Sequence, residues 1–193
     1  MIDIRRMQAR LGVREDGDPG PGTLGALFTR MGAGAPLAVE LGLAAAVHFR
    51  TYGILTSGLR LAHFMGQCAH ESGGFRYMEE IASGAAYEGR KDLGNTQPGD
   101  GRRYKGRGPI QLTGRANYRR FGRIIGIDLE AHPEIVGLPS VGLLCGCVYW
   151  DDRNLNALAD ADNLDRITRA INGGVNGLAD RRARTAAAKA IIL

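Results

Sequence analysis

Apolar residues at helical spacing are the feature of this chain that most limits its fold. They recur every three or four residues in separate segments, and glycine and proline gather in the gaps between these segments. The sequence contains no alternating run long enough for a confident strand. Pro21 and Pro36 suit a first helical position, and Ser140 is a good N-cap. We therefore predict helices at roughly 3–11, 21–31, 36–51, 58–70, 115–125, 140–153, 164–171 and 178–192.

The middle of the chain, residues 84–114, departs from this pattern. It holds eight glycines together with Pro98 and Pro109, which is typical of a long loop. Loops of this length in a compact domain are usually functional or mobile. We therefore predict a mainly α fold with at most a short β-hairpin in this segment.

The length and composition are ordinary for a globular domain. A chain of 193 residues can bury a real core, and 44% apolar with 23% charged residues excludes disordered and collagen-like chains. No stretch approaches the roughly 18 apolar residues of a spanning helix, so no stable membrane insertion is expected. The charged start does not resemble a signal peptide. Buried free thiols are the expected state of the three cysteines, because a metal site needs more ligands: Cys68, Cys145 and Cys147.

Positive charge is concentrated between Arg90 and Arg123. This stretch holds ten Lys and Arg against Asp92 and Asp100, a local balance of +8 that leaves −3 for the rest of a chain of net charge +5. Such a surface concentrates an anionic partner, whether cell-wall polymer, membrane surface or nucleic acid. Nucleic acid is the weakest of these, because no aromatic or helix-turn-helix signature accompanies the basic residues.

Several glutamates lie close enough in sequence to act together on a substrate: Glu71, Glu79, Glu80 and Glu88. Hydrolysis of a glycosidic bond needs one carboxyl group that donates a proton and, in inverting enzymes, a second that activates water. Glu71 ends a periodic apolar run and precedes Gly73-Gly74, which places it at the C-terminal end of a core helix. The negative end of the helix dipole and partly apolar neighbours both favour the protonated form that a general acid needs.

The spacing of Glu71 and Glu80 requires a turn between them. On one continuous helix, nine residues would put them about 13.5 Å apart on opposite faces. Gly73-Gly74 must therefore end the helix and let the chain fold back, which allows the roughly 6.5 to 9.5 Å separation of an inverting pair. His70 is more often structural than a ligand in such a context, since no second histidine lies at metal-binding spacing.

A set of motifs in a fixed order carries a family resemblance. They are His70-Glu71-Ser72-Gly73-Gly74, then YKGRGPIQLTG from Tyr104 to Gly114, then Asn117-Tyr118, then Ile171-Asn172-Gly173-Gly174. In this order they resemble chitinase-like glycoside hydrolases of family 19, and most closely the phage endolysin branch, over about residues 60 to 185. The resemblance implies a lysozyme-like helical fold with a long substrate cleft, and an inverting mechanism without metal or cofactor.

The resemblance also implies roles for single residues. Glu71 is the expected general acid, and Glu80 the expected general base. Thr113 stands where many relatives have a serine that helps hold the attacking water, and its hydroxyl can make the same hydrogen bond. Arg181 resembles an arginine that orients the base-side carboxylate. The full set expected to bind substrate is His70, Tyr104, Gln111, Asn117, Asn172 and Arg181.

Two departures leave the second acid open. Glu79 directly precedes Glu80, so a slip of one residue would exchange their roles. Glu88 is a further candidate, because the segment between the first acid and Tyr104 varies in length within the family. The run from Tyr104 to Thr113 also has the alternative of a purely structural glycine-rich turn.

Residues 1–34 resemble part of a small helical peptidoglycan-binding module, with a helix, a glycine-rich turn and a second helix. Only about 30 residues match, and a full module is longer. We expect either a truncated module or a helical pair integrated into the catalytic domain, which would occupy residues 35–193.

The leading functional hypothesis is a monomeric endolysin that hydrolyses β-1,4 bonds in the glycan strands of bacterial peptidoglycan. Chitin is the first alternative substrate, but a single tryptophan, Trp150, and 6% aromatic residues do not suit a chitin-fibre enzyme. A lytic transglycosylase, which needs Glu71 alone, and a non-catalytic wall-binding protein are further alternatives. The resemblance places the protein in the host cytoplasm until a separate membrane protein releases it to the wall.

Overall fold

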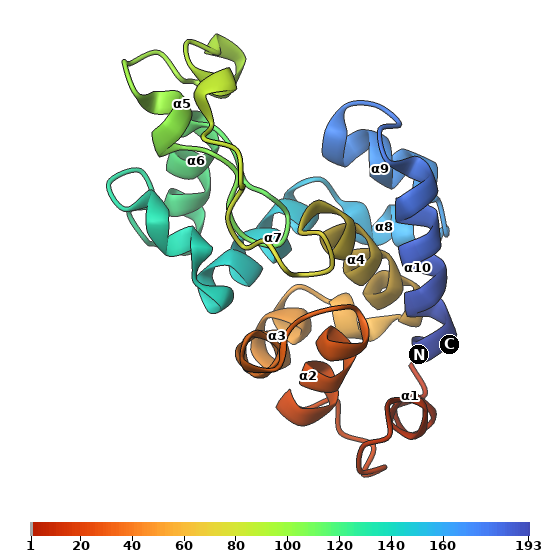
Figure 1. The fold of residues 1–193 in the computed structure, drawn as a ribbon. Coiled ribbons are helices and arrows are strands. Elements are labelled where there is room, and N and C mark those ends of the chain that lie inside the picture. The colour runs from red at the N-terminus through yellow and green to blue at the C-terminus, as the bar shows by residue number, and fades with distance from the viewer. Residues whose placement is uncertain (1) are drawn as a thin grey trace.

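The fold is mostly helical, as a computed structural model describing residues 2–193 shows (Figure 1). The α-helices are α1 (Ile4–Leu11), α2 (Pro21–Arg30), α3 (Ala35–Thr51), α4 (Gly58–Glu71), α5 (Asp100–Arg103), α6 (Arg115–Ile125), α7 (Pro139–Asp152), α8 (Leu155–Asp160), α9 (Leu164–Asn172) and α10 (Leu178–Ile192). Short 3-10 helices lie between them: η1 (Ile54–Thr56), η2 (Ala85–Tyr87), η3 (Lys91–Leu93) and η4 (Pro133–Gly137). Across residues 2–193, no helix has both the length and the apolarity to cross a membrane.

The helices expected from periodicity are all confirmed, and their ends lie within one residue of the predicted positions. Pro21 opens α2, as its restricted backbone favours. The expected N-cap at Ser140 is wrong, because α7 begins at Pro139 and Leu138 takes the capping position without a side-chain hydrogen bond. The short helices α5 and α8 were not expected, since four and six residues are too few to show a helical period.

Within residues 2–193, pairing between extended segments consists of two isolated bridges that share Arg107. Arg107 forms isolated antiparallel bridges with Glu79 on one side and Leu112 on the other. These bridges tie the segment after α4 to the run that precedes α6. The prediction of a mainly α fold with at most a short hairpin is confirmed.

A line of aromatic rings joins the helices of the core. The rings of Phe28 in α2, Phe49 in α3, Phe64 in α4 and Trp150 in α7 follow one another with centroids 6.2, 5.1 and 5.3 Å apart. All four side chains are fully buried, and each such contact adds about 0.5 to 1.5 kcal/mol beyond area burial. The three cysteines are free and buried, as predicted.

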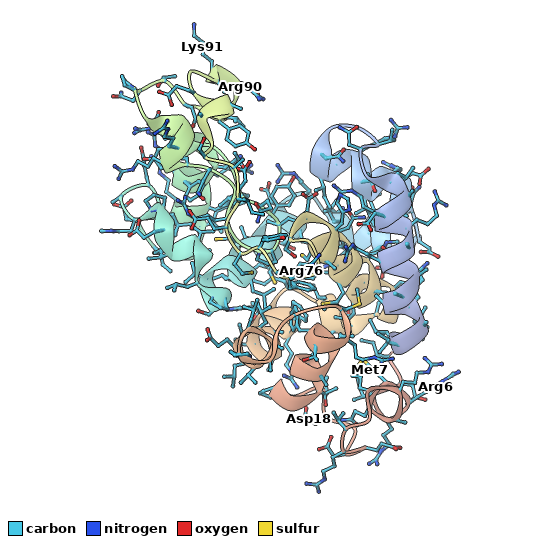
Figure 2. All side chains as sticks on the ribbon, in the orientation of Figure 1. Arg6, Met7, Asp18, Arg76, Arg90 and Lys91 are labelled. Atoms are coloured by element: carbon cyan, nitrogen blue, oxygen red, sulfur yellow. The ribbon has the colours of Figure 1, made fainter. Side chains whose placement is uncertain are left out.

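Two groups of helices rise on either side of the α4 and α7 region (Figure 1). One holds α5, α6 and the glycine-rich segment, and the other holds the turn from α9 into α10. Arg90 and Lys91 stand at the outer end of the first group and point away from the body (Figure 2). The N-terminal helix α2 packs along α3, and Phe28 also meets Phe75 edge to face at 5.0 Å. The wall-binding role of residues 1–34 stays a prediction.

Candidate active site

The segment after Glu71 leaves the helix through consecutive residues with positive φ. Gly73, Gly74 and Phe75 have φ values of 60°, 77° and 60°, a conformation that glycine adopts freely and phenylalanine does not. The Ser72 hydroxyl accepts a hydrogen bond from the Phe75 amide at 2.8 Å and so holds this turn. The predicted helix end at Gly73-Gly74 is confirmed, and it places Glu71 at the last position of α4.

A buried arginine from α10 holds the Glu71 carboxylate. Arg181 Nη2 donates to Glu71 Oε1 at 2.5 Å, and Arg181 Nη1 donates to Gln67 Oε1 at 2.5 Å. Arg181 is only 2% exposed, whereas the Glu71 side chain is 20% exposed. Within the described residues, Glu71 Oε2 accepts no hydrogen bond. We expected Arg181 to orient the base-side carboxylate, and the structure corrects this because Arg181 pairs with Glu71.

Glu80 is held by a different set of donors. Tyr87 Oη donates to Glu80 Oε1 at 3.0 Å, and the Gly106 amide donates to Oε2 at 3.1 Å. Lys105 Nζ donates to the Glu80 backbone carbonyl at 3.1 Å and brings a positive charge close to the same residue. Burial and the contact with Glu80 raise the pKa of the Tyr87 phenol, which stays a donor. Donors on both oxygens therefore fix the orientation of the Glu80 carboxylate.

Side-chain oxygen atoms of Glu80, Gln111 and Thr113 converge on Gly106. A Cβ atom at Gly106 would lie 2.6 Å from Gln111 Oε1, 3.3 Å from Glu80 Oε2 and 3.4 Å from Thr113 Oγ1. The fold therefore gathers these three polar atoms around one glycine, and a side chain there would collide with Gln111. The Thr113 hydroxyl donates to the Gln111 carbonyl at 2.9 Å, which leaves its lone pairs to accept from a water molecule.

The two alternative second acids are engaged elsewhere. Glu79 is exposed and pairs with Lys105 at 3.2 Å and Arg107 at 3.1 Å. Burial alone would raise the pKa of Glu79, but its hydrogen bonds with Lys105 and Arg107 outweigh this and lower it. Both oxygens of Glu88 accept backbone amides at the start of α5, from Gly99 at 2.6 Å and Gly101 at 2.8 Å. This geometry favours Glu80 as the partner of Glu71.

Tyr104 lies in the core and not on a binding surface. Its side chain is 1% exposed, and its hydroxyl donates to the Glu130 carbonyl at 3.0 Å. Its ring packs against Tyr118 at 5.4 Å and under the Arg115 guanidinium at 5.0 Å. The expectation that Tyr104 contacts substrate is therefore wrong, because the aromatic ring anchors the glycine-rich segment to α6.

The side-chain amides of Gln111 and Asn117 donate hydrogen bonds to nearby backbone carbonyls. Gln111 Nε2 donates to the Tyr77 and Gly108 carbonyls at 3.1 and 3.0 Å, and Asn117 Nδ2 donates to the Thr113 carbonyl at 2.7 Å. These bonds fix the run that precedes α6. The roles of Gln111 and Asn117 toward a sugar stay predictions.

The amide of Asn172 closes the loop between α9 and α10. Its Nδ2 donates to the Asn176 carbonyl and its Oδ1 accepts from the Gly174 amide, both at 2.8 Å. His70 contacts the neighbouring helix α10, because His70 Nδ1 lies 2.6 Å from Asp180 Oδ2. Toward a sugar, the roles of Asn172 and His70 are likewise untested predictions.

Sequence reasoning missed Gln67, Tyr87 and Lys105, which contact the two acids or their partners. Gln67 lies one helical turn before Glu71, so its spacing of four residues was a signal that it shares a face with the acid. Tyr87 gave no comparable signal, because its reach to Glu80 depends on the path of a loop.

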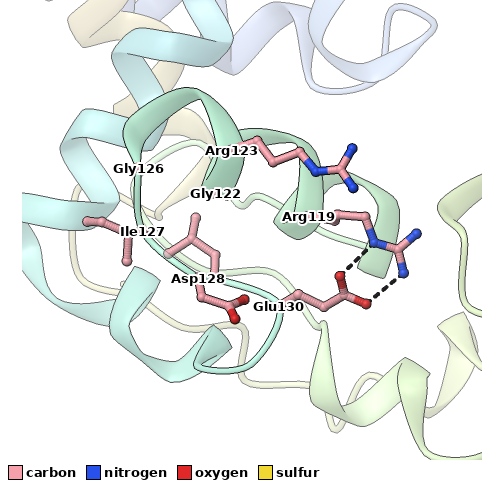
Figure 3. A pocket seen from close by; sticks show the side chains of 8 residues that line it. Arg119, Gly122, Arg123, Gly126, Ile127, Asp128 and Glu130 are labelled. Carbon is pink, nitrogen blue, oxygen red and sulfur yellow. Dashed lines mark hydrogen bonds and ion pairs between the residues drawn. The ribbon is translucent and has the colours of Figure 1, made fainter.

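A pocket of about 370 Å³ lies apart from these acids, at the end of α6 (Figure 3). Arg119 pairs with Glu130 through two hydrogen bonds of 2.6 and 2.7 Å, and Arg123 lies beside it at the rim (Figure 3). None of the predicted acids lines this pocket. Two arginines and two acidic residues line it: Arg119, Arg123, Asp128 and Glu130.

Comparison with known proteins identifies the family. The family described as chitinase class I, glycoside hydrolase family 19, matches residues 42–154. A glycosyl hydrolase family 19 domain-containing protein of Haemophilus influenzae is 30% identical over 64% of this chain and 75% of its own length. An endochitinase of Arabidopsis thaliana is 33% identical over 80% of this chain, which spans 55% of that relative.

Solved structures show the same fold. Chitinase C from Streptomyces griseus superimposes with a TM-score of 0.72 at 25% identity, over 91% of this chain and 94% of that one. A class IV chitinase from Zea mays gives a TM-score of 0.65 at 23% identity, over 89% and 90% of the two chains, and supports the fold alone. The chain therefore belongs to glycoside hydrolase family 19 and has the lysozyme-like helical fold of that family.

Proposed function

We propose that this protein is an endolysin-type glycosidase that hydrolyses β-1,4 bonds between the amino sugars of bacterial peptidoglycan with inversion. Glu71 serves as the general acid and Glu80 as the general base. The observation that carries this assignment is the unequal hydrogen bonding of the two carboxylates. Among the described residues, one oxygen of Glu71 accepts no hydrogen bond and can face the leaving oxygen, whereas both oxygens of Glu80 are held by donors beside Gly106.

Thr113 positions the attacking water in this proposal. Its hydroxyl and Glu80 Oε2 both lie beside Gly106, at 3.4 and 3.3 Å from the point where a Cβ would stand. Gln111 Oε1 lies 2.6 Å from the same point, so three oxygen atoms converge beside the base. A water held there would donate one proton to Glu80 and another to Thr113.

Peptidoglycan is favoured over chitin by the charge and by the aromatic residues. The stretch from Arg90 to Arg123 carries a balance of +8, which suits an anionic wall. The only tryptophan, Trp150, is fully buried and is unavailable as a stacking platform for a chitin chain. We propose that the protein acts as a monomer on the glycan strands, without nucleic acid or stable membrane insertion.

Chitin is the second candidate substrate, because the plant relatives are named endochitinases. Both substrates are β-1,4-linked and carry N-acetyl groups. The same pair of carboxylates would cleave either one.

Mass analysis of digested peptidoglycan and of chitin oligosaccharides tests the proposal. Hydrolysis of the wall gives muropeptides with reducing ends, and chitin oligosaccharides stay largely intact. Anhydro ends would identify a lytic transglycosylase, free peptides would refute glycan cleavage, and preferred cleavage of chitin would establish the second candidate. Binding to wall without any product would identify a non-catalytic protein.

A further inference from the structure

Gln67 is a buried polar side chain that accepts a hydrogen bond from Arg181, the partner of the proposed acid. It lies on α4, four residues before Glu71, and is fully buried. Its Oε1 accepts from Arg181 Nη1 at 2.5 Å. The amide oxygen must face Arg181, because a guanidinium has donors only.

The other end of the Gln67 amide is unpaired. Its Nε2 is buried and has no hydrogen-bond partner among the described residues. An unpaired buried donor is costly, and such groups in folded proteins call for an explanation in function or strain. An apolar residue would fill this position in the core without that cost, so the retained amide points to the use of its oxygen.

Gln67 determines how Arg181 can reach Glu71. Arg181 has three directed contacts: Nη1 to Gln67, Nη2 to Glu71, and Nε to the Asn176 carbonyl at 3.2 Å. An arginine free of other acceptors tends to bind a carboxylate through two parallel bonds, one to each oxygen. In this structure Nη1 is directed to Gln67, and Nη2 alone reaches Glu71, through one oxygen.

We propose that Gln67 is a positioning residue for catalysis. By accepting from Arg181 Nη1 it restricts the arginine to Glu71 Oε1 and keeps Oε2 free to carry the proton for the leaving oxygen. The inference rests on the proposed function of Glu71 as general acid. It adds a residue that acts through Arg181 and does not touch substrate.

Arg181 is the charged side chain in direct contact with Glu71. The other titratable groups nearby are neutral or paired elsewhere. Tyr149 of α7 and Cys68 of α4 both feel the Glu71 charge, but burial raises the pKa of each and keeps them neutral at neutral pH. His70 on α4 pairs with Asp180, which also accepts from Arg184 of α10 at 2.7 Å. A substitution at Gln67 replaces none of these side chains.

The test compares the pH dependence of kcat/KM in two variants, with reducing ends from purified peptidoglycan as the readout. Gln67→Leu removes the acceptor, so Arg181 turns Nη1 to the free oxygen of Glu71 and stabilises its ionised form. The alkaline limb should move down by about 0.5 to 1 pH unit, and kcat near neutral pH should fall about tenfold. Gln67→Glu keeps an acceptor for Nη1 and adds a negative charge, so the alkaline limb should move up.

Opposite shifts in the two variants support the proposal. An alkaline limb that stays in place in Gln67→Leu, or moves the same way in both, would overturn it. Gln67→Met, which has similar length without the carbonyl, repeats the test if thermal unfolding shows that Gln67→Leu does not fold. Thr168→Val is the matched control, because it changes another buried side chain with an unpaired oxygen and should move neither limb. If the wild-type protein releases no reducing ends, the proposed function fails before this question arises.

Discussion

The guanidinium of Arg181 and the carboxylate of Glu71 meet at 2.5 Å, although 110 residues separate them in the chain. The contact ties α10 to the last residue of α4. Arg181 thus holds the proposed acid in position from a different helix. Helical periodicity in the sequence does not predict that these two helices meet.

Replacement of Arg181 by lysine should impair both catalysis and stability. A lysine keeps the charge but cannot bond Gln67, Glu71 and Asn176 at once, so Glu71 loses its fixed orientation. We expect kcat to fall at least about tenfold and Tm to fall by roughly 2 to 4 °C for each kcal/mol of stability lost, measured by reducing-end release and thermal unfolding. Arg182→Lys is the matched control on the same helix, because Arg182 is exposed and pairs with exposed Asp165; equal losses in both variants would argue against the account.

Separate Gln substitutions at the three candidate partners should identify the second acid. Glu80→Gln removes the proposed base and should lower kcat by about 10² to 10³-fold. Glu79→Gln weakens the ion pairs of an exposed carboxylate with Lys105 and Arg107 and should keep activity within about threefold. Glu88→Gln should lower Tm by a few degrees through weakened contacts with the amides of Gly99 and Gly101. A larger kcat loss in Glu79→Gln or Glu88→Gln than in Glu80→Gln would reassign the base.

Stability should decrease below about pH 6.5 because of His63. The side chain is fully buried, Nδ1 is unpaired among the described residues, and burial lowers its pKa despite the contact of Nε2 with Asp162 at 2.6 Å. A depressed histidine pKa means that the unfolded chain takes up a proton first, so stability is full above the unfolded value and is lost as pH falls.

Thermal unfolding between pH 7.5 and 5 checks this expectation. His63→Gln should flatten the decrease, whereas His132→Gln should leave it unchanged, because His132 is exposed. Burial also lowers the pKa of His48, so a smaller decrease should remain in His63→Gln. A wild-type protein that is equally stable at pH 5 and pH 7.5 would contradict this interpretation.

Glu130 should make a pH-dependent contribution to the stability of the group of helices that holds α5 and α6. Hydrogen bonds from Arg119, and then from Arg115, lower the pKa of Glu130 to about 2 against the opposing effect of burial. A carboxylate with a depressed pKa contributes stability above its unfolded value and loses it as pH falls from about 4.5 toward 2. Glu130→Gln should cost at most about 3 kcal/mol at pH 7 in urea unfolding, and the difference should shrink near pH 2. Asp92→Asn, in an exposed pair with Arg90, serves as control.

The helices of the fold were predictable from the sequence, and the contacts of the site only in part. Helical ends follow from local periodicity and from glycines such as Gly73 and Gly74, which act over a few residues. The family resemblance implies that Glu80 and Thr113 act on the same water, and both approach Gly106. The approach of Gln111 to the same glycine was not predicted, and the catalytic roles stay predictions.

The errors at the site all concern long-range contacts. Arg181 was assigned to the wrong carboxylate, because the sequence does not specify which residue α10 meets when it packs on α4. Tyr104 was read as a binding residue, but its ring serves as the anchor of a loop on Tyr118, and burial cannot be deduced from a motif. Gln67 belongs to no chemical motif. Its spacing of four residues from Glu71 indicated a shared helix face, but its contact with Arg181 could not be deduced from the sequence.

The most direct test of the account is reducing-end release from purified peptidoglycan by Glu71→Gln. The amide keeps the shape and the contact with Arg181 but cannot donate a proton as a carboxylic acid does. We expect a loss of at least about 10³-fold in kcat, with wall binding and Tm near the wild-type values. Activity within about tenfold of wild type in a folded Glu71→Gln protein would contradict the assignment of Glu71 as the general acid.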